Sequence, residues 1–282
     1  MDDPRSGPVL EESEQLYCYG HPDTPTRLRC SRCERPICGR CAIPASVGQH
    51  CPECVAEARR SAPRVRGAVA AQAPGVVAIL VVNLTFLILQ QLVPGLTGRL
   101  ALAPAEIASG EWWRLVSPMV LHAGGLHFLM NSLVLWIYGP HVEGAFGTVR
   151  FLALYVISGF VGAVASYAFS PPNIVGVGAS GAIFGIAGVL LVYLFRRRSQ
   201  TFVYNEMRGI AIFIGINLVI GFALPNIDYW AHIGGLVGGM ALTLGFDNDK
   251  RSNAAVLELA TAGAVIGAGL LLFVFRTGQL IA

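Results

Sequence analysis

A single serine stands among glycines at the head of an apolar run, in the segment Gly176 to Gly185, written GVGASGAIFG. Close packing would explain Ser180 without any chemistry, because small residues at a spacing of four let membrane helices approach one another. The alternative is a nucleophile that works inside the bilayer. Gly178 and Gly181 would then let the chain turn sharply and let a substrate backbone come close.

Polar residues in other apolar runs help to decide between these readings. His127 and Asn131 are four residues apart and share one face of a helix, and His232 opens a later run. At about 1.5 Å per residue, Ser180, His232 and His127 each lie about 22 to 24 Å from the next charged residue along their helices. A common depth on three separate segments favours one site over three unrelated packing roles.

These residue types fit amide hydrolysis. A serine hydroxyl becomes a strong nucleophile when an imidazole takes its proton, which assigns Ser180 as the nucleophile and His232 as the base. The oxyanion of the tetrahedral intermediate needs hydrogen-bond donors, and His127, Asn131 and the Ser180 backbone N–H can supply them. Because no carboxylate lies within the apolar runs at this depth, we predict a dyad without an orienting aspartate.

The composition identifies the elements that must position these residues. The chain has 282 residues, of which 54% are hydrophobic and only 13% are charged, with a mean hydropathy of +0.59. Such a chain is a polytopic membrane protein, built of helices that cross about 30 Å of hydrocarbon. The predicted spans lie near Val76 to Val93, Val120 to Tyr138, Phe151 to Phe169, Val175 to Phe195, Ile210 to Leu224, Ala231 to Phe246 and Ala255 to Phe275.

The basic residues that flank these spans predict their orientation. The first twenty residues contain no apolar signal segment, so we expect the polar N-terminal part to be cytoplasmic. Basic residues concentrate on the cytoplasmic side in this topology, as the positive-inside rule requires, and an outward C-terminus follows. The inner set is Arg59, Arg60, Arg64, Arg66, Arg150, Arg196, Arg197, Arg198, Arg208, Lys250 and Arg251, and the outer set is Arg99, Arg114 and Arg276.

Taken together, these motifs resemble the rhomboid family of intramembrane serine proteases. The first similar segment is Gly178-Ala179-Ser180-Gly181, and the second is the series formed by His122, His127 and Asn131. The others are Ala231-His232 with the glycines that follow it, Trp113-Arg114 in the first long loop, and Glu143. The resemblance covers about Val76 to Phe246. It implies an all-α fold with a six-helix core and a cavity open to the outside, to which the seventh span would be an addition.

The resemblance also implies roles for the residues in these motifs. Ser180 would be the nucleophile and His232 the base, while His127, Asn131 and the Ser180 amide would hold the oxyanion. His122, Gly178, Gly181 and Phe184 would support them. Many relatives have a tyrosine four residues after the nucleophile that packs on the catalytic histidine. Phe184 keeps the aromatic face and loses the hydroxyl, so we expect the base to be held less firmly, with little loss of rate.

The N-terminal part carries a different kind of motif. Four pairs of ligands, each with two residues between its members, give eight donors, the number that two tetrahedral zinc sites need. An oxidised disulfide module is the alternative, but an odd number of cysteines in a reducing compartment favours zinc. The pairs are Cys18 with His21, Cys30 with Cys33, Cys38 with Cys41 and Cys51 with Cys54, with His50 as an alternate ligand.

The first part of this pattern is similar to a B-box zinc finger, a small protein-interaction module. How the pairs share the two ions stays open, although pairing of the first with the third and of the second with the fourth is common in such modules. The arginines of this module are interspersed with acidic residues, and the module is tethered to a membrane, so we expect it to bind a protein partner and no nucleic acid.

The predicted organisation has four parts. Residues 1–60 form a cytoplasmic zinc-stabilised domain, 61–74 a linker whose arginines lie on anionic lipid, 75–250 the six-helix protease core and 251–282 the extra membrane helix. Alanine- and glycine-rich spans favour a bacterial plasma membrane.

The expected function is cleavage of transmembrane protein substrates in or next to their spans, with no catalytic cofactor. The alternative function is a catalytically inactive relative that binds membrane clients. Intact Ser180, His232, His127 and Asn131 favour the enzyme.

Overall fold

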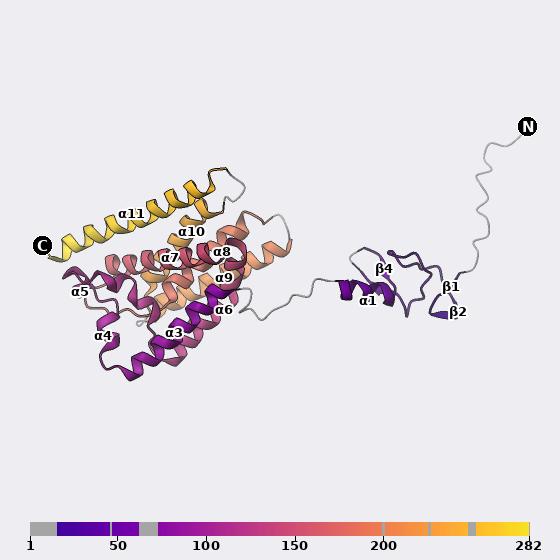
Figure 1. The fold of residues 1–282 in the computed structure, drawn as a ribbon, viewed down its shortest axis with the longest axis horizontal. Helices are drawn as coiled ribbons and strands as arrows, with labels where there is room; N and C mark the ends of the chain where they lie inside the picture. The colour runs from indigo at the N-terminus through magenta and orange to yellow at the C-terminus, as the bar shows by residue number, and fades with distance from the viewer. Residues whose placement is uncertain are drawn as a thin grey trace, which may run out of the picture. The chain divides into compact units, whose positions relative to one another are not determined.

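The computed structural model of the chain contains two compact units, Met1–Arg66 and Gly67–Ala282. Most of the predicted linker, 62–72, lies outside the described residues. The two units are drawn in Figure 1 and are described here separately. The structure describes residues 16–45, 47–61, 73–198, 201–224, 227–247 and 252–281.

The first unit has little secondary structure and an unusual core. Its buried interior consists of six of its cysteines and Ile37, so hardly any hydrocarbon is available to hold it together. Two short antiparallel hairpins and one helix surround this core. The elements are β1 (Tyr17–Cys18), β2 (His21–Pro25), β3 (Ile43–Pro44), β4 (Gln49–His50) and α1 (Pro52–Ser61).

The named elements of the second unit are all helices among its described residues, apart from an isolated bridge between Leu102 and Gly176, which agrees with the predicted all-α membrane fold. Seven long helices correspond to the seven predicted spans, and α11 packs along α7 and α10 as an addition to the other six (Figure 1). The long helices are α3 (Pro74–Leu92), α6 (Gly125–Phe146), α7 (Thr148–Phe169), α8 (Ser180–Phe195), α9 (Thr201–Ala223), α10 (Tyr229–Phe246) and α11 (Ala254–Ile281).

The seven long helices are not equally suited to cross a membrane. Among the described residues, four helices are long and apolar enough to cross a membrane by length and composition, namely Pro74–Leu92, Thr148–Phe169, Val203–Ala223 and Ala254–Ile281. The apolar helix α8 has only 16 residues, and it is among the most buried of the bundle. Because α8 is buried among the other helices, it can be shorter than the bilayer is thick.

Two predicted spans begin too early. Val120 ends a 3-10 turn, η2 (Ser117–Val120), and α6 starts only at Gly125. Likewise the segment from Val175 is extended, and α8 starts at Ser180 itself. Apolar composition predicted helix in both places, but these residues instead form the walls of a site at the ends of the helices.

The long connection between α3 and α6 is ordered by a buried cation. It contains α4 (Leu96–Leu100), α5 (Pro104–Ala108) and η1 (Trp112–Leu115). Arg114 is only 5% exposed, and its guanidinium donates to the carbonyl oxygens of Gly98 and Ala101, each at 2.8 Å, and pairs with Glu111. Arg114 therefore ties α4 to η1.

A buried carboxylate fixes the start of α3. Glu143 on α6 accepts hydrogen bonds from the backbone N–H groups of Gly75 at 2.8 Å and Val76 at 2.9 Å, and from the Thr148 hydroxyl. The first N–H groups of a helix have no partner within the helix, and a negative charge is favourable there. Glu143 thus caps a helix distant in sequence and joins α3, α6 and α7.

Helices α8 and α10 meet backbone to backbone. A Cβ placed at Gly235 would overlap the carbonyl oxygen of Gly181, and one placed at Gly239 would overlap that of Gly185. On the other side of α10, a Cβ at Gly234 would overlap Ala165 of α7. Glycine at these positions allows the close approach that small residues give to membrane helices.

At the end of α8 away from Ser180, a second contact joins the same two helices. Asp247, which follows α10, accepts from Arg197 at 2.7 Å and from Arg196 at 3.2 Å. Burial raises the pKa of the Asp247 carboxyl, but the hydrogen bonds and charge of Arg197, helped by Arg196, lower it overall.

We expect Gly235→Ala to lower the stability of the membrane unit by about 1 to 3 kcal/mol, the usual cost of overpacking. The added methyl group has no room beside the Gly181 carbonyl, so α8 and α10 must separate. Thermal unfolding in detergent measures this loss. Gly263→Ala on α11, where a Cβ meets nothing within 4 Å, is the matched control and should leave the unfolding temperature nearly unchanged.

Candidate active site

Ser180 is the first residue of α8, and it is only partly exposed. The preceding strand-like segment is held by the bridge between Gly176 and Leu102 and by the hydrogen bond from Gly178 N to Pro118 O at 2.9 Å. Gly178 has φ +137°, and a Cβ there would lie 2.8 Å from Cε1 of His127. Glycine is therefore required for both the backbone conformation and the space.

His232 lies in the first turn of α10, one residue after Ala231. The α8–α10 contact brings its ring onto Phe184, with the ring centroids 4.2 Å apart and the planes within 5° of parallel. The side chain is buried, and its Nδ1 has no hydrogen-bond partner among the described residues. Stacking on Phe184 is thus the main interaction that orients the imidazole.

Ser180 and His232 belong to the two helices that meet at Gly181 and Gly235. A Cβ at Gly181, the residue after the serine, would lie 3.2 Å from the carbonyl oxygen of Ala231, the residue before the histidine. No hydrogen bond joins the two side chains in the described part of the chain. Catalytic hydrogen bonds often tighten only when substrate is bound, so this geometry is compatible with a dyad.

His127 faces the same space from α6. The point where a Gly178 Cβ would sit is 3.1 Å from His127 Nε2 and 3.5 Å from Ser180 Oγ. The Ala123 backbone N–H donates to His127 Nδ1 at 3.1 Å. A neutral ring that accepts at Nδ1 carries its proton on Nε2, so His127 presents an N–H donor toward the region of Ser180.

Asn131 and His122 surround His127. The Asn131 amide donates to the His127 carbonyl oxygen at 2.9 Å, and its NH₂ group has a second hydrogen to offer. The His122 ring lies edge-on to the His127 ring at 5.5 Å, and Gln90 bonds both the N–H and the C=O of the His122 backbone. All eight residues predicted for this site therefore lie around the starts of α6, α8 and α10.

Asp228 lies at this site and was missed by the sequence analysis. It is the N-cap of α10, accepts from Ala231 N at 3.0 Å and also from the Ser166 hydroxyl of α7. It does not bond the His232 ring, so it is not the third member of a triad. An aspartate three residues before an apolar helical run is a helix N-cap signal that could have located it.

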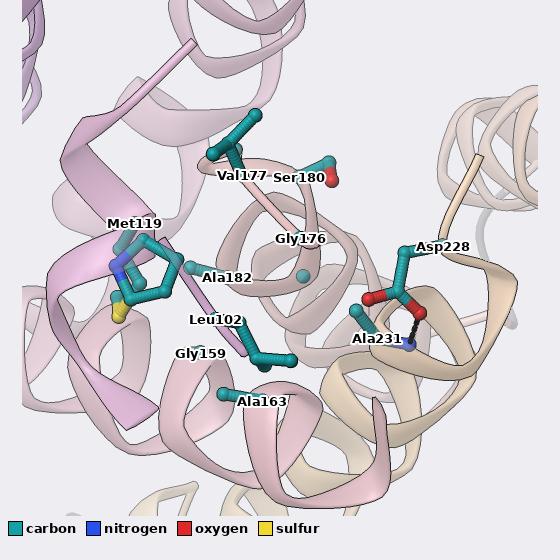
Figure 2. A pocket seen from close by; sticks show the side chains of 13 residues that line it. Leu102, Met119, Gly159, Ala163, Gly176, Val177, Ser180, Ala182, Asp228 and Ala231 are labelled. Atoms are coloured by element: carbon teal, nitrogen blue, oxygen red, sulfur yellow. Dashed lines mark hydrogen bonds between the residues drawn. The ribbon is translucent and has the colours of Figure 1, made fainter. Parts of the chain in front are cut away.

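Asp228 and Ser180 line one small cavity of about 30 Å³, which Figure 2 shows between α7, α8, α10 and the loop before α6. Such a volume holds about two waters. Its walls are otherwise apolar or backbone. The remaining lining residues are Leu102, Pro118, Met119, Gly159, Ala163, Gly176, Val177, Gly178, Gly181, Ala182 and Ala231.

In the first unit, the cysteines and one histidine form two tetrads. Within each, the ligand atoms all lie within 4.8 Å of one another. The pairs interleave, first with third and second with fourth, and His50 lies outside both groups. The tetrads are Cys18, His21, Cys38, Cys41 and Cys30, Cys33, Cys51, Cys54.

These tetrads have the chemistry of metal sites. All seven cysteines lie in the described part of the chain and are free thiols there, which argues against a disulfide module. Burial raises the pKa of Cys30, but backbone N–H groups, foremost that of Cys51, lower it overall to about 6. In the same tetrad the Cys51 side chain, together with burial, raises the pKa of Cys54 to about 12. Four crowded sulfurs cannot all ionise without a cation among them.

Comparison with known proteins places the membrane unit in a family. The model of the Rhomboid domain matches residues 109–247, a range that contains every predicted catalytic residue and excludes both tetrads and α11.

Three relatives illustrate the similarity. The chain is 45% identical over 171 residues to "Rhomboid protease GluP" of Bacillus subtilis (strain 168), covering 58% of this chain and 33% of that one. It is 41% identical over 137 residues to "Putative rhomboid protease YdcA" of the same organism, covering 49% of this chain and 68% of that one. "Rhomboid protease AarA" of Providencia stuartii is 33% identical over 165 residues, covering 49% of this chain and 57% of that one.

The match to the first of these relatives thus spans only a third of that relative's length. The second relative is matched over 68% of its length. The predicted resemblance is confirmed, and the multi-pass membrane protein described here belongs to the rhomboid family.

Proposed function

We propose that this protein is an intramembrane serine endopeptidase that cuts other membrane proteins in or next to their transmembrane segments. The observation that carries the proposal is the convergence of three helix starts: His232 stacks on Phe184 of the helix that begins at Ser180, and His127 and Ser180 Oγ lie on either side of the Gly178 position. Its relatives are named as proteases, which supports the same activity.

The reaction would follow the acyl-enzyme course of serine hydrolases. The His232 imidazole takes the proton of Ser180 as Oγ attacks the peptide carbonyl carbon. The negative oxygen of the tetrahedral intermediate accepts hydrogen bonds from His127 Nε2–H, the free N–H of the Asn131 amide and the Ser180 backbone N–H. The C–N bond breaks and His232 returns the proton to the leaving amine. Water then hydrolyses the ester with His232 as base.

The remaining predicted residues would support this chemistry. Phe184 would hold the imidazole plane, and His122 would hold the His127 ring from behind. Gly178 leaves the space between His127 and Ser180 empty, which is where the carbonyl oxygen of a substrate would have to enter.

We further propose that each tetrad of the first unit binds one structural Zn²⁺. Thiolate and imidazole donors in sets of four suit tetrahedral zinc, and the His21 ring presents Nδ1 to the three sulfurs of its tetrad at 3.3 to 3.8 Å. The bound ions would hold together a unit that has almost no hydrophobic core. No metal would take part in the proteolysis.

The proposed organisation keeps a cytoplasmic zinc domain over 1–60, a linker over 61–74, the protease core over 75–250 and an extra helix over 251–282. The basic residues flanking the spans support this orientation, and a bacterial plasma membrane is the proposed location. The zinc domain would bind a protein partner. The substrates would be transmembrane proteins.

The experiment that tests the function combines labelling with cleavage. The full chain, purified in detergent, is treated with a fluorophosphonate probe and with a single-span reporter protein, and the labelled peptide is identified by mass spectrometry. We expect phosphonylation at Ser180 and cleavage of the reporter. A folded protein that neither labels nor cuts would overturn the proposal and favour a client-binding protein without activity.

A further inference from the structure

Two polar contacts hold α11 against α7, one near each end of α11. Near its start, the Glu258 carboxylate pairs with Arg150 at 2.7 Å. Near its end, the Thr277 hydroxyl is hydrogen-bonded to the Tyr167 hydroxyl at 2.8 Å. Arg150 and Tyr167 lie within the residues that the Rhomboid domain matches, whereas Glu258 and Thr277 lie beyond them. The core therefore carries two polar side chains whose partners come from the added helix.

The hydrogen bond between Tyr167 and Thr277 has a defined direction. The Thr277 hydroxyl also donates to the Phe273 carbonyl oxygen, at 2.9 Å. Because a threonine hydroxyl has one proton, Tyr167 is the donor in its pair with Thr277. Tyr167 is fully buried, and within the described part of the chain Thr277 is the hydrogen-bond partner of its hydroxyl. Without Thr277, Tyr167 would keep an unpaired donor inside the bilayer, which is costly.

Tyr167 also belongs to a small apolar cluster that α11 covers. The Phe273 ring of α11 lies 5.6 Å from the Tyr167 ring, and the helix also contacts α5, near the C-terminus in Figure 1. Close-packed side chains transmit a displacement to their neighbours. The buried members of the cluster are Leu102, Ile107, Leu115, Ala163, Val164 and Tyr167, and the residues of α11 that pack against it are Leu272, Phe273 and Leu280.

Leu102 connects this cluster to the segment that leads to Ser180. Its backbone N–H donates to the Gly176 carbonyl oxygen, and its carbonyl oxygen accepts from the Gly176 N–H, both at 2.9 Å. Gly176 is four residues before Ser180, and the only other backbone contact described above for this segment is that of Gly178 with Pro118. A shift of Leu102 would therefore move Ser180 and its backbone N–H, which is one of the proposed oxyanion donors.

On the basis of the proposed function, we propose that α11 positions the nucleophile of this protease, and that Thr277 is a positioning residue that acts on Ser180 through Tyr167 and Leu102. Thr277 does not contact the reacting atoms, so its role is indirect. The other contact of α11, between Glu258 and Arg150, lies about 25 Å from Tyr167 along α7, at about 1.5 Å per residue. It would anchor the helix without affecting the site.

The test compares variants of Thr277 in the full chain, purified in detergent. Thr277→Val keeps the shape of the side chain and removes the hydroxyl that accepts from Tyr167. We expect kcat for a single-span reporter and the rate of fluorophosphonate labelling at Ser180 to fall by about ten-fold, with KM little changed. A displacement of about 1 Å can cost about a hundred-fold in rate, and the shift expected here is smaller. Thr277→Ser keeps the acceptor and should retain both rates.

Glu258→Gln is the control that separates positioning from stability. It weakens the ion pair with Arg150 at the end of α11 away from Ser180. We expect it to lower the unfolding temperature and, well below that temperature, to leave kcat and the labelling rate nearly unchanged. A purely structural α11 predicts that Thr277→Val behaves in the same way as Glu258→Gln. Equal effects of the two variants on kcat and on labelling would overturn the proposal.

Tyr167→Phe provides a second variant in case Thr277→Val does not fold. It removes the same hydrogen bond without leaving a donor unpaired, so we expect it to fold and to lower kcat by about three-fold, the value of one ordinary hydrogen bond. Wild-type rates in Tyr167→Phe and in folded Thr277→Val would overturn the role of α11 while the protease function stands. A folded wild-type chain that neither labels nor cuts would overturn both.

Discussion

Ser180→Ala lowers the cleavage rate by about four to six orders of magnitude, and adding His232→Ala to it lowers the rate hardly further. The two side chains act as one unit, because the hydroxyl needs the imidazole to become a nucleophile, and the later proton transfers by the imidazole act on the ester that the hydroxyl has formed. In a serine protease where this has been measured, losing the nucleophile or the base alone costs about as much as losing all members of the catalytic unit. Any residual rate comes from oxyanion donors such as His127.

The measurement is kcat for a single-span reporter, with wild type, both single variants and the double variant. Ser158→Ala is the matched control, since this buried serine of α7 donates to the Leu154 carbonyl oxygen of its own helix. We expect it to retain most of the activity. Substantial cleavage by Ser180→Ala would exclude the dyad. Additive losses in the double variant would show that His232 acts independently of Ser180.

Removal of metal unfolds the first unit and leaves the membrane unit folded. Structural zinc sites of this type contribute about 10 to 16 kcal/mol of binding free energy, far more than a core of six cysteines and Ile37 can provide. A strong chelator should therefore abolish the β-hairpins and α1. The membrane unit has its own apolar core and should keep its helical content and its unfolding temperature.

Metal analysis and protease digestion check this result. We expect two zinc ions per chain in wild type, and one or none in Cys38→Ser, with rapid digestion between residues 16 and 61 after chelation. His50→Ala is the control, because His50 lies outside both tetrads, and it should retain two ions. A first unit that resists digestion without metal would contradict the proposal.

Much of this architecture could be predicted from sequence because membrane helices and metal ligands leave local signals. Apolar runs of sufficient length predicted seven helices, and all seven exist. The ligand pairs predicted two tetrads, but not how they interleave, since the pairing of Cys18 with Cys38 depends on how the chain returns on itself. Spacing along a chain does not contain that information.

The errors lie where local composition and tertiary structure conflict. The residues from Val120 to Gly124 and from Val175 to Ala179 are apolar enough for a span, yet they turn around the site instead of continuing a helix. Asp228 was missed for a related reason. The search for site residues considered charges within the apolar runs, and Asp228 lies just before one of them. Its neighbours Ser166 and Gly176 come from other segments, and only the fold brings them together.

The contact between α8 and α10 has a consequence for how the protein behaves in its membrane. Where two helices meet through glycine, their separation is set by main-chain atoms, and no side chain has to select a rotamer to maintain it. The ion pairs of Asp247 with Arg196 and Arg197 add a second attachment between α8 and α10, at the end away from Ser180. As the bilayer thickens, thins or bends around the protein, α8, which carries Ser180, and α10, which carries His232, should tilt together as one rigid body. Their register would then be independent of the lipid composition around them.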